Sequence, residues 1–138
     1  MAVRISGPIR LKKTRFLVNR IDTLPVPQKR DFAKYLRYKS REAWDSEYSL
    51  DPNVPVQFTL HSLFHESFKS RLPDCDGLAW VAKRMLDGAV DAKLIVDDSP
   101  EYVVRVILEA PLISSPADDE TMIAYPVAFQ GVLDQIGR

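Results

Sequence analysis

The segment "LPDCDGLAWVAKRMLDGAVDAKLIVDDSPEYV", residues 72–103, decides how the fold of this 138-residue chain is interpreted. One pair of aspartates, Asp74 and Asp76, opens an amphipathic run. A second and adjacent pair, Asp97 and Asp98, follows that run. Carboxylates that lie close together repel one another, and gathering them becomes favourable when a cation lies between them. The segment therefore raises the question whether one short helix organises a cation site.

The run between the two pairs has helical periodicity. Residues 77 to about 92 are predicted to form a helix, with Asp76 as its N-cap. Asp74 and Asp76 would then share one side of an extended segment, while Cys75 points the other way and fills a small buried space. The apolar stripe of this helix consists of Leu78, Val81, Ala82, Met85 and Leu86.

After this helix the chain passes through "AKLIV", a short strand or turn, into the second pair. If that segment packs beside the helix, Asp97 and Asp98 return next to Asp74 and Asp76. Three converging carboxylates make a site of hard oxygen ligands that suits Mg²⁺ or Mn²⁺. The alternative is plain, because the first pair could serve only as a helix cap and the second only as a turn.

The segments before residue 72 predict strands and one basic helix. Strands are expected in residues 3–13, broken at Gly7-Pro8, and a further strand is expected at residues 16–18. A helix from Pro27 would bury Phe32, Leu36, Ala43 and Trp44. The alternating segment 54–64 predicts a strand. One face of that strand would carry Val54, Val56, Phe58, Leu60 and Ser62, and the other Gln57, Thr59 and His61.

After the aspartates, residues 101–110 alternate and predict another strand. Pro126 is expected to start a short last helix. Its inward residues would be Phe129, Val132, Leu133 and Ile136. The predicted order, roughly ββαβαβα, favours an α+β or mixed α/β domain.

Composition limits the class of protein. With 46% hydrophobic and 28% charged residues, the chain is expected to fold as one domain. No apolar run approaches the roughly 20 residues that span a bilayer, and the start lacks the apolar core of a signal peptide. The single cysteine, Cys75, excludes an internal disulfide and favours the reducing cytoplasm.

The net charge of zero hides an asymmetry along the chain. Residues 1–73 carry 14 basic and 7 acidic side chains, whereas residues 74–138 carry 5 basic and 12 acidic ones. A basic half could face a polyanion, and an acidic half could hold cations. Charge alone is equally compatible with two solvated faces of an ordinary soluble protein.

The motifs "PDCDG", "K…LD" and "VDDSPEYV" together resemble the RusA-type Holliday junction resolvases, a family of small phage and prophage endonucleases. That family has Asp-x-Asp-Asn opening a helix, a lysine within the helix, an aspartate four residues later and a late Asp-Asp before a strand. Here Lys83 precedes Asp87 by four residues, and Asp87 precedes Asp98 by eleven. The resemblance covers about residues 54–110. Over the first fifty residues only the order of strand, polar loop and basic helix agrees.

The chain also departs from the family pattern. Gly77 stands in place of the asparagine, and about three extra residues separate Asp76 from the lysine position. Counting forward from Asp76 places Trp80 at that position, whereas counting back from the later aspartates places Lys83 there. We prefer Lys83, because a turn added at the start of the helix leaves the lysine on the same helix face and keeps its chemistry. Lys93 replaces the glycine that usually ends the helix, and the helix expected from residue 126 lies outside the pattern.

The resemblance implies a small domain with a short mixed sheet flanked by helices. The domain would span residues 1–138, with a basic N-terminal part (about 1–53), a metal-site core (54–110) and a C-terminal extension (111–138). The implied metal ligands for Mg²⁺, which Mn²⁺ can replace, are Asp74, Asp76 and Asp98, with Asp97 as support or alternative ligand.

The resemblance further implies that Lys83 touches the scissile phosphate or the attacking water, and that Asp74, Asp76, Lys83 and Asp98 form the catalytic set. Such enzymes cut four-way DNA junctions as homodimers, because two symmetric cuts require two active sites. Phosphate contacts are expected from basic residues, which would make binding sensitive to salt. These residues are Lys29, Arg30, Lys34, Arg37, Lys69 and Arg71.

Two other functions remain open at this point. One is a catalytically weak DNA-binding protein on the same fold, and the other is a small metal-dependent phosphohydrolase. His61 and His65 do not suggest zinc, because four residues of a strand span about 13 Å. Trp44 and Trp80 are expected in the core or in a dimer interface, with stacking of Trp80 on an unpaired base as the alternative.

Overall fold

A computed structural model describes five stretches of the chain and the secondary structure within them. The described residues are 4–11, 23–44, 50–70, 72–114 and 127–136. The elements are β1 (Arg4–Leu11), α1 (Val26–Ala43), β2 (Val56–His65), the 3₁₀ helix η2 (Glu66–Phe68), α2 (Cys75–Asp91), β3 (Val103–Leu108), β4 (Leu112–Ser114) and β5 (Val127–Gln135).

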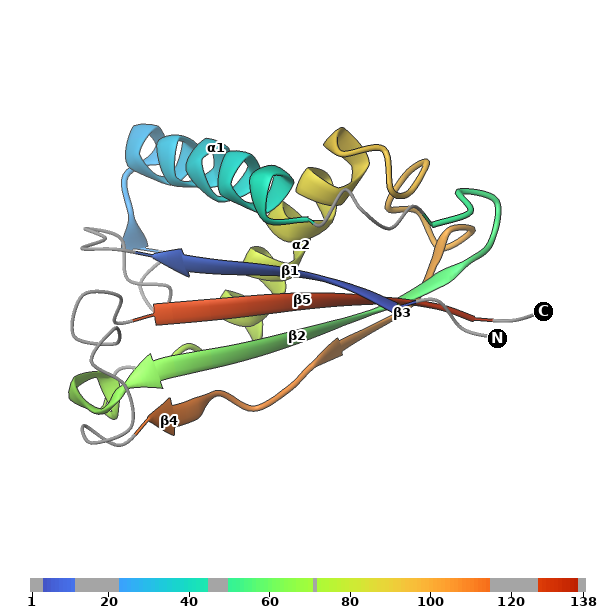
Figure 1. The fold of residues 1–138 in the computed structure, drawn as a ribbon. Helices are drawn as coiled ribbons and strands as arrows, with labels where there is room; N and C mark the ends of the chain where they lie inside the picture. The colour runs from blue at the N-terminus through green and yellow to red at the C-terminus, as the bar shows by residue number, and fades with distance from the viewer. Residues whose placement is uncertain (1–3, 12–22, 45–49, 71, 115–126, 137–138) are drawn as a thin grey trace.

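The strands form one mixed sheet of five strands (Figure 1). Its order is β1-β5-β2-β3, and β4 pairs with the later part of β2. Strand β5 is antiparallel to both of its neighbours, whereas β3 and β4 are parallel to β2. Parallel neighbours need a crossover connection, which η2 and α2 provide between β2 and β3. The chain is therefore a small α+β domain with a mixed sheet, as predicted.

Alternation in β2 gives the sheet its buried face. Val56, Phe58, Leu60 and Phe64 are almost completely buried, as this pattern predicts for the face that packs on the helices. His61 on the opposite face is exposed. Ser62 and Thr59 are buried as well, although they lie on opposite faces of the strand.

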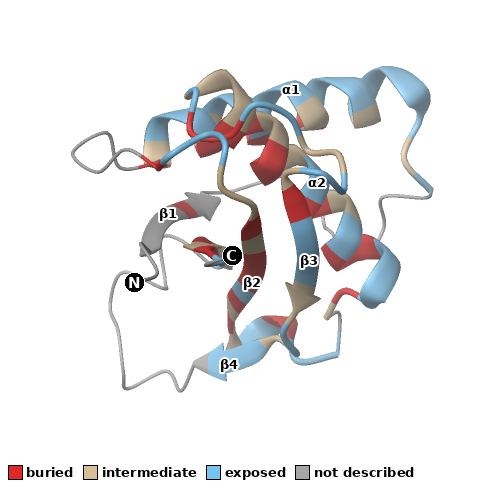
Figure 2. Ribbon diagram, turned by 90° about the vertical axis from the view of Figure 1, so that its right-hand side faces the viewer, coloured by how far each residue is buried: buried red, intermediate tan, exposed pale blue. Residues whose placement is uncertain are grey.

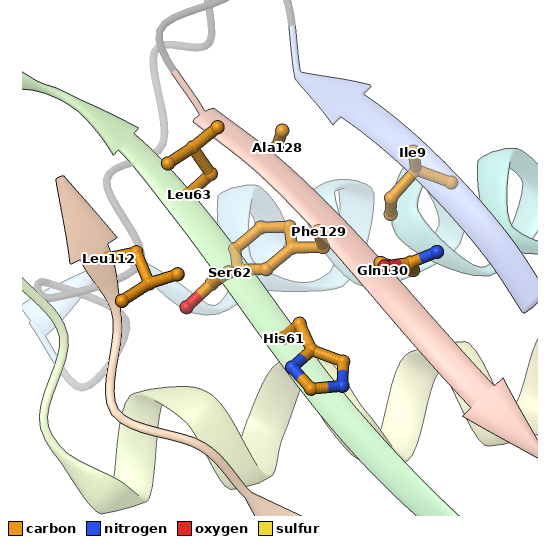
Figure 3. Close-up of a pocket in the computed structure, with 8 residues that line it drawn as sticks. All are labelled: Ile9, His61, Ser62, Leu63, Leu112, Ala128, Phe129 and Gln130. Atoms are coloured by element: carbon orange, nitrogen blue, oxygen red, sulfur yellow. The ribbon is translucent and has the colours of Figure 1, made fainter. Parts of the chain in front are cut away.

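Both helices cover the same face of the sheet (Figures 1 and 3). In α1, the predicted residues Phe32 and Leu36 are fully buried, and Pro27 lies in the first turn. In α2, the whole predicted stripe is buried. The outward surface of α1 is exposed while its inner surface faces the core (Figure 2). Trp44, directly after α1, donates a hydrogen bond from Nε1 to the backbone oxygen of Met85 at 3.2 Å.

The last predicted helix is wrong, because residues 127–135 form strand β5 in the interior of the sheet. Phe129 and Leu133 are buried on the helix-facing side, as strand alternation requires. Val132 is buried on the other side, and Ile136 lies beyond the strand with 37% of its surface exposed. Gly131 lies between Phe129 and Leu133 on the same side of the strand. A Cβ at this position would approach side-chain atoms of α2, β2 and Trp44 to within about 3 Å, so the close packing here needs a residue without a side chain.

Two further expectations differ from the structure, and a third lies outside the described residues. Strand β1 runs through Gly7-Pro8 without a break, and its pairing with β5 continues across both residues. The part of the chain from residue 111 contributes β4 and β5 to the main sheet rather than a helix beside it. The strand expected at residues 16–18 lies outside the described residues. The observed order of elements is therefore βαβαβββ, apart from η2.

Candidate functional site

The start of α2 is set by Asp74 rather than by Asp76. The Oδ1 atom of Asp74 accepts a hydrogen bond from the backbone N–H of Gly77 at 2.9 Å, the standard N-cap contact. Asp76 lies in the first helical turn, where a carboxylate interacts favourably with the helix dipole. The predicted cap was wrong by two residues because the helix starts earlier than the periodicity of its apolar residues indicates.

The earlier helix start changes the direction of the side chains around it. Asp74 and Asp76 do not share an extended segment, since only Asp74 has an extended backbone. Cys75 is the first helical residue and is exposed, so the prediction that it fills a buried space was wrong. One oxygen of Asp74 is already engaged by the cap, and Asp76 is exposed to solvent.

The second group of carboxylates surrounds Lys83 on the exposed side of α2. The Nζ atom of Lys83 donates a hydrogen bond to Asp87 at 3.1 Å and contacts the Oδ2 atom of Asp98. The pKa of Lys83 is raised, chiefly by its hydrogen bond to Asp98, and the pKa of Asp98 is lowered by that same bond. Both groups are therefore held in their charged forms.

Asp97 completes the loop that brings Asp98 to the helix. The Oδ1 atom of Asp97 accepts a hydrogen bond from the backbone N–H of Asp98 at 2.8 Å. This local bond fixes the turn predicted for the pair, and the exposed carboxylate of Asp97 stays beside that of Asp98. Asp98 is partly buried, with 23% of its side chain exposed.

The structure distinguishes the positions of Lys83 and Trp80. Trp80 lies half-buried at the seam between the helices, with its ring stacked on Phe32 at 5.5 Å. The guanidinium of Arg84 lies over the same ring at 4.6 Å. Lys83 is free of this packing and points to the aspartates. The lysine is thus the residue of the two that contacts Asp98.

The two groups of carboxylates do not meet. Among the described residues, which include all the candidate ligands, no three His, Cys, Asp or Glu side chains lie close enough to share a metal ion. Asp74 precedes Lys83 by nine residues, which corresponds to about 13 Å along a helix axis. The topology explains the separation, because α2 crosses from the end of β2 to the start of β3 with one pair before it and the other after it.

Asp87 and Asp98 are the carboxylates that could hold a metal with the least rearrangement. Mg²⁺ is often bound through one or two carboxylates together with waters and substrate phosphates, so a pair of this kind suits its chemistry. Sequence reasoning used Asp87 for spacing but did not assign it to the site. Its i,i+4 relation to Lys83 was the available signal. The shared site of Asp74, Asp76 and Asp98 stays a prediction.

The predicted DNA-contacting cations have different surroundings. Arg37 donates two hydrogen bonds to Asp91, at 2.6 and 2.7 Å, which ties α1 to α2 and raises the pKa of Arg37. Lys34 and Lys69 are exposed. Lys29 and Arg30 lie near the start of α1, facing a groove shared with α2. Arg71 lies outside the described residues.

The open face of the sheet carries a separate cavity of about 440 Å³ (Figure 3). It is mainly apolar, and its few polar side chains include His61, Ser62 and Gln130. The helices lie on the opposite face of the sheet, so the cavity is not part of the Lys83 group (Figure 3). The remaining lining residues are Ile9, Leu63, Leu112, Ala128 and Phe129.

His61 and His65 lie in different surroundings. His61 is exposed on the open face of β2, while His65 caps η2 by accepting a hydrogen bond from the backbone N–H of Ser67 at 3.1 Å.

Of the described helices, none is long and apolar enough to cross a membrane. Comparison with protein-family models finds no match for the chain, and comparison with curated proteins finds none either.

Proposed function

We propose that the chain is a metal-dependent endodeoxyribonuclease of the RusA type that cuts four-way junctions or other branched DNA as a cytoplasmic homodimer. The observation that carries this proposal is the contact of Lys83 with both Asp87 and Asp98. These residues are four and fifteen positions apart, and their spacing is the part of the sequence that agrees best with the family pattern. Their gathering on one exposed helix face supports a functional role.

Lys83 is suited to holding a phosphate. Its side chain is about half exposed, and its raised pKa keeps the ammonium charged at neutral pH. A phosphate oxygen could replace one of its two carboxylate partners and leave the other to orient the amine. A positive charge placed in this way stabilises the negative charge that develops on the scissile phosphate.

The carboxylates provide the oxygen ligands that a magnesium site requires. When bound, Mg²⁺ would supply an activated water and neutralise charge on the phosphate. Asp98 would be the central ligand, with Asp87 or Asp97 beside it. Asp74 and Asp76 would have to approach this group to complete the set of ligands that the resemblance implies.

The separation of the two aspartate pairs favours a second candidate, a DNA-binding protein on the same fold with little or no catalytic activity. Since no three potential ligands among the described residues share one site, binding of a metal ion depends on rearrangement or on DNA phosphates. Such a protein would keep the cations of α1 and would bind junctions without cutting them.

The deciding experiment incubates the protein with a labelled four-way junction, or with linear duplex of the same sequence, in Mg²⁺ or EDTA. Symmetric nicks that require both the junction and Mg²⁺ are expected. Tight binding by the wild-type protein without nicks would support the second candidate, and equal weak binding to both DNAs would contradict both proposals.

Two matched pairs of variants assign the residues. Asp98→Asn is expected to bind the junction but not cut it, whereas Asp91→Asn removes a comparable carboxylate from an ion pair outside the site and should leave cutting intact. Lys83→Ala should slow single-turnover cutting by about 10²–10³-fold, the effect of losing one transition-state contact. Its control is Lys39→Ala, an exposed lysine paired with Glu42. Equal rates for Lys83→Ala and its control would refute the role of Lys83.

A further inference from the structure

A groove of about 240 Å³ lies between the first turns of α1 and the middle of α2. Three of its six lining residues are cations, and none is acidic. The lining residues are Val26, Lys29, Arg30, Ala33, Trp80 and Arg84. This concentration of positive charge on one concave surface contrasts with the acidic Lys83 group on the same helix.

Arg84 is held in place while its hydrogen-bond donors remain unused. Its guanidinium lies 4.6 Å from the centre of the Trp80 ring, which in turn stacks on the fully buried Phe32. The Nε atom of Arg84 is buried without a hydrogen-bond partner among the described residues. The nearest carboxylate, that of Asp87, is 3.7 Å from Nη1, beyond hydrogen-bond distance. A planar fork of donors, fixed before a ligand arrives, matches the geometry of a phosphate group.

The α1 side of the groove adds charge of the same sign. Lys29 and Arg30 form no ion pair with any described residue. The first turn of α1 contains no acidic residue, and no side chain caps it. The positive end of the α1 dipole lies at this region, and no acidic side chain of the first turn offsets it. Lys29, Arg30 and the start of α1 therefore converge with Arg84, whose one ion-pair partner among the described residues is Asp87.

We infer that this groove binds a phosphate group of a DNA strand, held by Lys29, Arg30 and Arg84. The inference rests on the proposed function, and it assigns one substrate phosphate to a place next to the Lys83 group. Trp80 acts as the support that positions Arg84, because Phe32 and the guanidinium already contact the ring surface that a base would need.

The groove is physically linked to the proposed catalytic group through Asp87. This carboxylate lies 3.1 Å from Lys83 Nζ and 3.7 Å from Arg84 Nη1. A phosphate that engages Arg84 weakens the pull of the guanidinium on Asp87. Asp87 would then be available to interact with Lys83 or with a metal ion. A phosphate bound in the groove would therefore favour metal binding at the Lys83 group.

The test measures binding in EDTA, where no cutting occurs, over a range of salt concentrations. Arg84→Gln is expected to weaken junction binding about 5–10-fold and to lower the salt slope by about one, as the loss of one phosphate contact predicts. The matched control is Arg105→Gln, an exposed arginine of β3 that bonds to Gln57 on the sheet. Equal affinity and equal salt slope in Arg84→Gln and its control would overturn the inference.

Trp80 fluorescence identifies the source of the phosphate. A short single-stranded oligonucleotide is expected to change the emission at far lower concentration than inorganic phosphate, and Trp80→Phe should abolish the change while junction binding remains. If inorganic phosphate acts as well as the oligonucleotide, the groove serves small phosphates and its assignment to a DNA strand is overturned. These readouts need no cleavage, so a wild-type protein that binds junctions but does not cut them would sink the nuclease proposal and leave the groove intact.

Discussion

The two helices approach each other closely at Gly88, and replacing this glycine by alanine tests the packing directly. A Cβ atom at this position would lie 2.6 Å from the Cβ of Ser40, 2.9 Å from the backbone nitrogen of Arg41 and 3.1 Å from the backbone oxygen of Arg37. Two of these three neighbours are backbone atoms of α1, which a change of rotamer cannot move. The helices would have to separate to accept the methyl group.

The size of the effect follows from two opposing terms. Carbon atoms in good contact lie about 3.5–4.0 Å apart, so α1 and α2 would separate locally by roughly 1 Å. Overpacking of this kind costs about 1–3 kcal/mol, while glycine to alanine in a helix normally gains up to about 1 kcal/mol. With backbone atoms of α1 in the way, Gly88→Ala should lose about 1–2 kcal/mol, and the melting temperature should fall by roughly 3–10 °C.

Urea and thermal denaturation followed by circular dichroism measure this change. The control is Ala79→Gly at an exposed position of the same helix, which should also destabilise, by about 0.5–1 kcal/mol through helix propensity alone. Opposite substitutions on one helix are then both unfavourable. A Gly88→Ala variant that melts at a higher temperature than the wild type would show that the helices do not approach as closely as described.

The other predictions concern local contacts. Asp91→Asn should lose about 0.5–1 kcal/mol at pH 7 through its pair with Arg37. Because folding lowers the pKa of Asp91, this loss should disappear as the pH falls below about 3.8, as acid titration of both proteins would show. Asp74→Ala should lose about 1 kcal/mol with the helix cap, measured by urea denaturation. Mg²⁺ should raise the melting temperature of the wild type but not that of Asp98→Asn. Lys93→Gly should raise stability by about 0.5–1 kcal/mol in the same urea assay.

The spacing of apolar residues predicted correctly those helices and strands that are buried on one face only. In α2 every residue of the expected stripe is buried, because one helix face packs on the sheet and α1. In β2 the buried and exposed sides follow the expected alternation over most of the strand. Such patterns are local consequences of one-sided burial, so the sequence alone could reveal them.

The last strand could not be identified from its apolar spacing. Phe129, Val132 and Leu133 fit a helical stripe, yet they lie in a strand, where Phe129 and Leu133 face the helices and Val132 is buried on the other side. An apolar residue on the second face, here Val132, breaks the simple alternation of a strand, so that the apolar residues can imitate a helix. Gly131 was the informative residue, since a glycine is unfavourable inside a helix and here permits close packing against α2.

The candidate site shows the same division between local and long-range information. The spacing of Lys83, Asp87 and Asp98 belongs to the family resemblance, and the structure contains direct contacts of Lys83 with both aspartates, which the sequence analysis did not predict. The relation of Asp74 and Asp76 to this group depends on the path of the whole crossover between β2 and β3. Sequence spacing does not determine how far apart the two ends of such a crossover lie, so it did not reveal the separation of the two pairs.

The backbone conformation at the C-terminal end of α2 sets the direction of the loop that carries Asp98. Lys93 is the critical residue of this turn. Lys93 has a φ of 63°, in the left-handed region. Its N–H donates a hydrogen bond to the backbone oxygen of Val90, and the N–H of Leu94 donates one to the backbone oxygen of Ala89. These two hydrogen bonds are those of a Schellman motif. The backbone thus keeps a conformation that favours glycine, at a cost of about 1–2 kcal/mol for a residue with a Cβ. Lys93→Gly removes this cost but gives up a cation near the negative helix end, which leaves a gain of about 0.5–1 kcal/mol. Lys93→Ala loses the cation and keeps the Cβ, so it should be no more stable than the wild type. If the glycine and alanine variants are equally stable, the left-handed turn that leads the chain back to Lys83 is not present in solution.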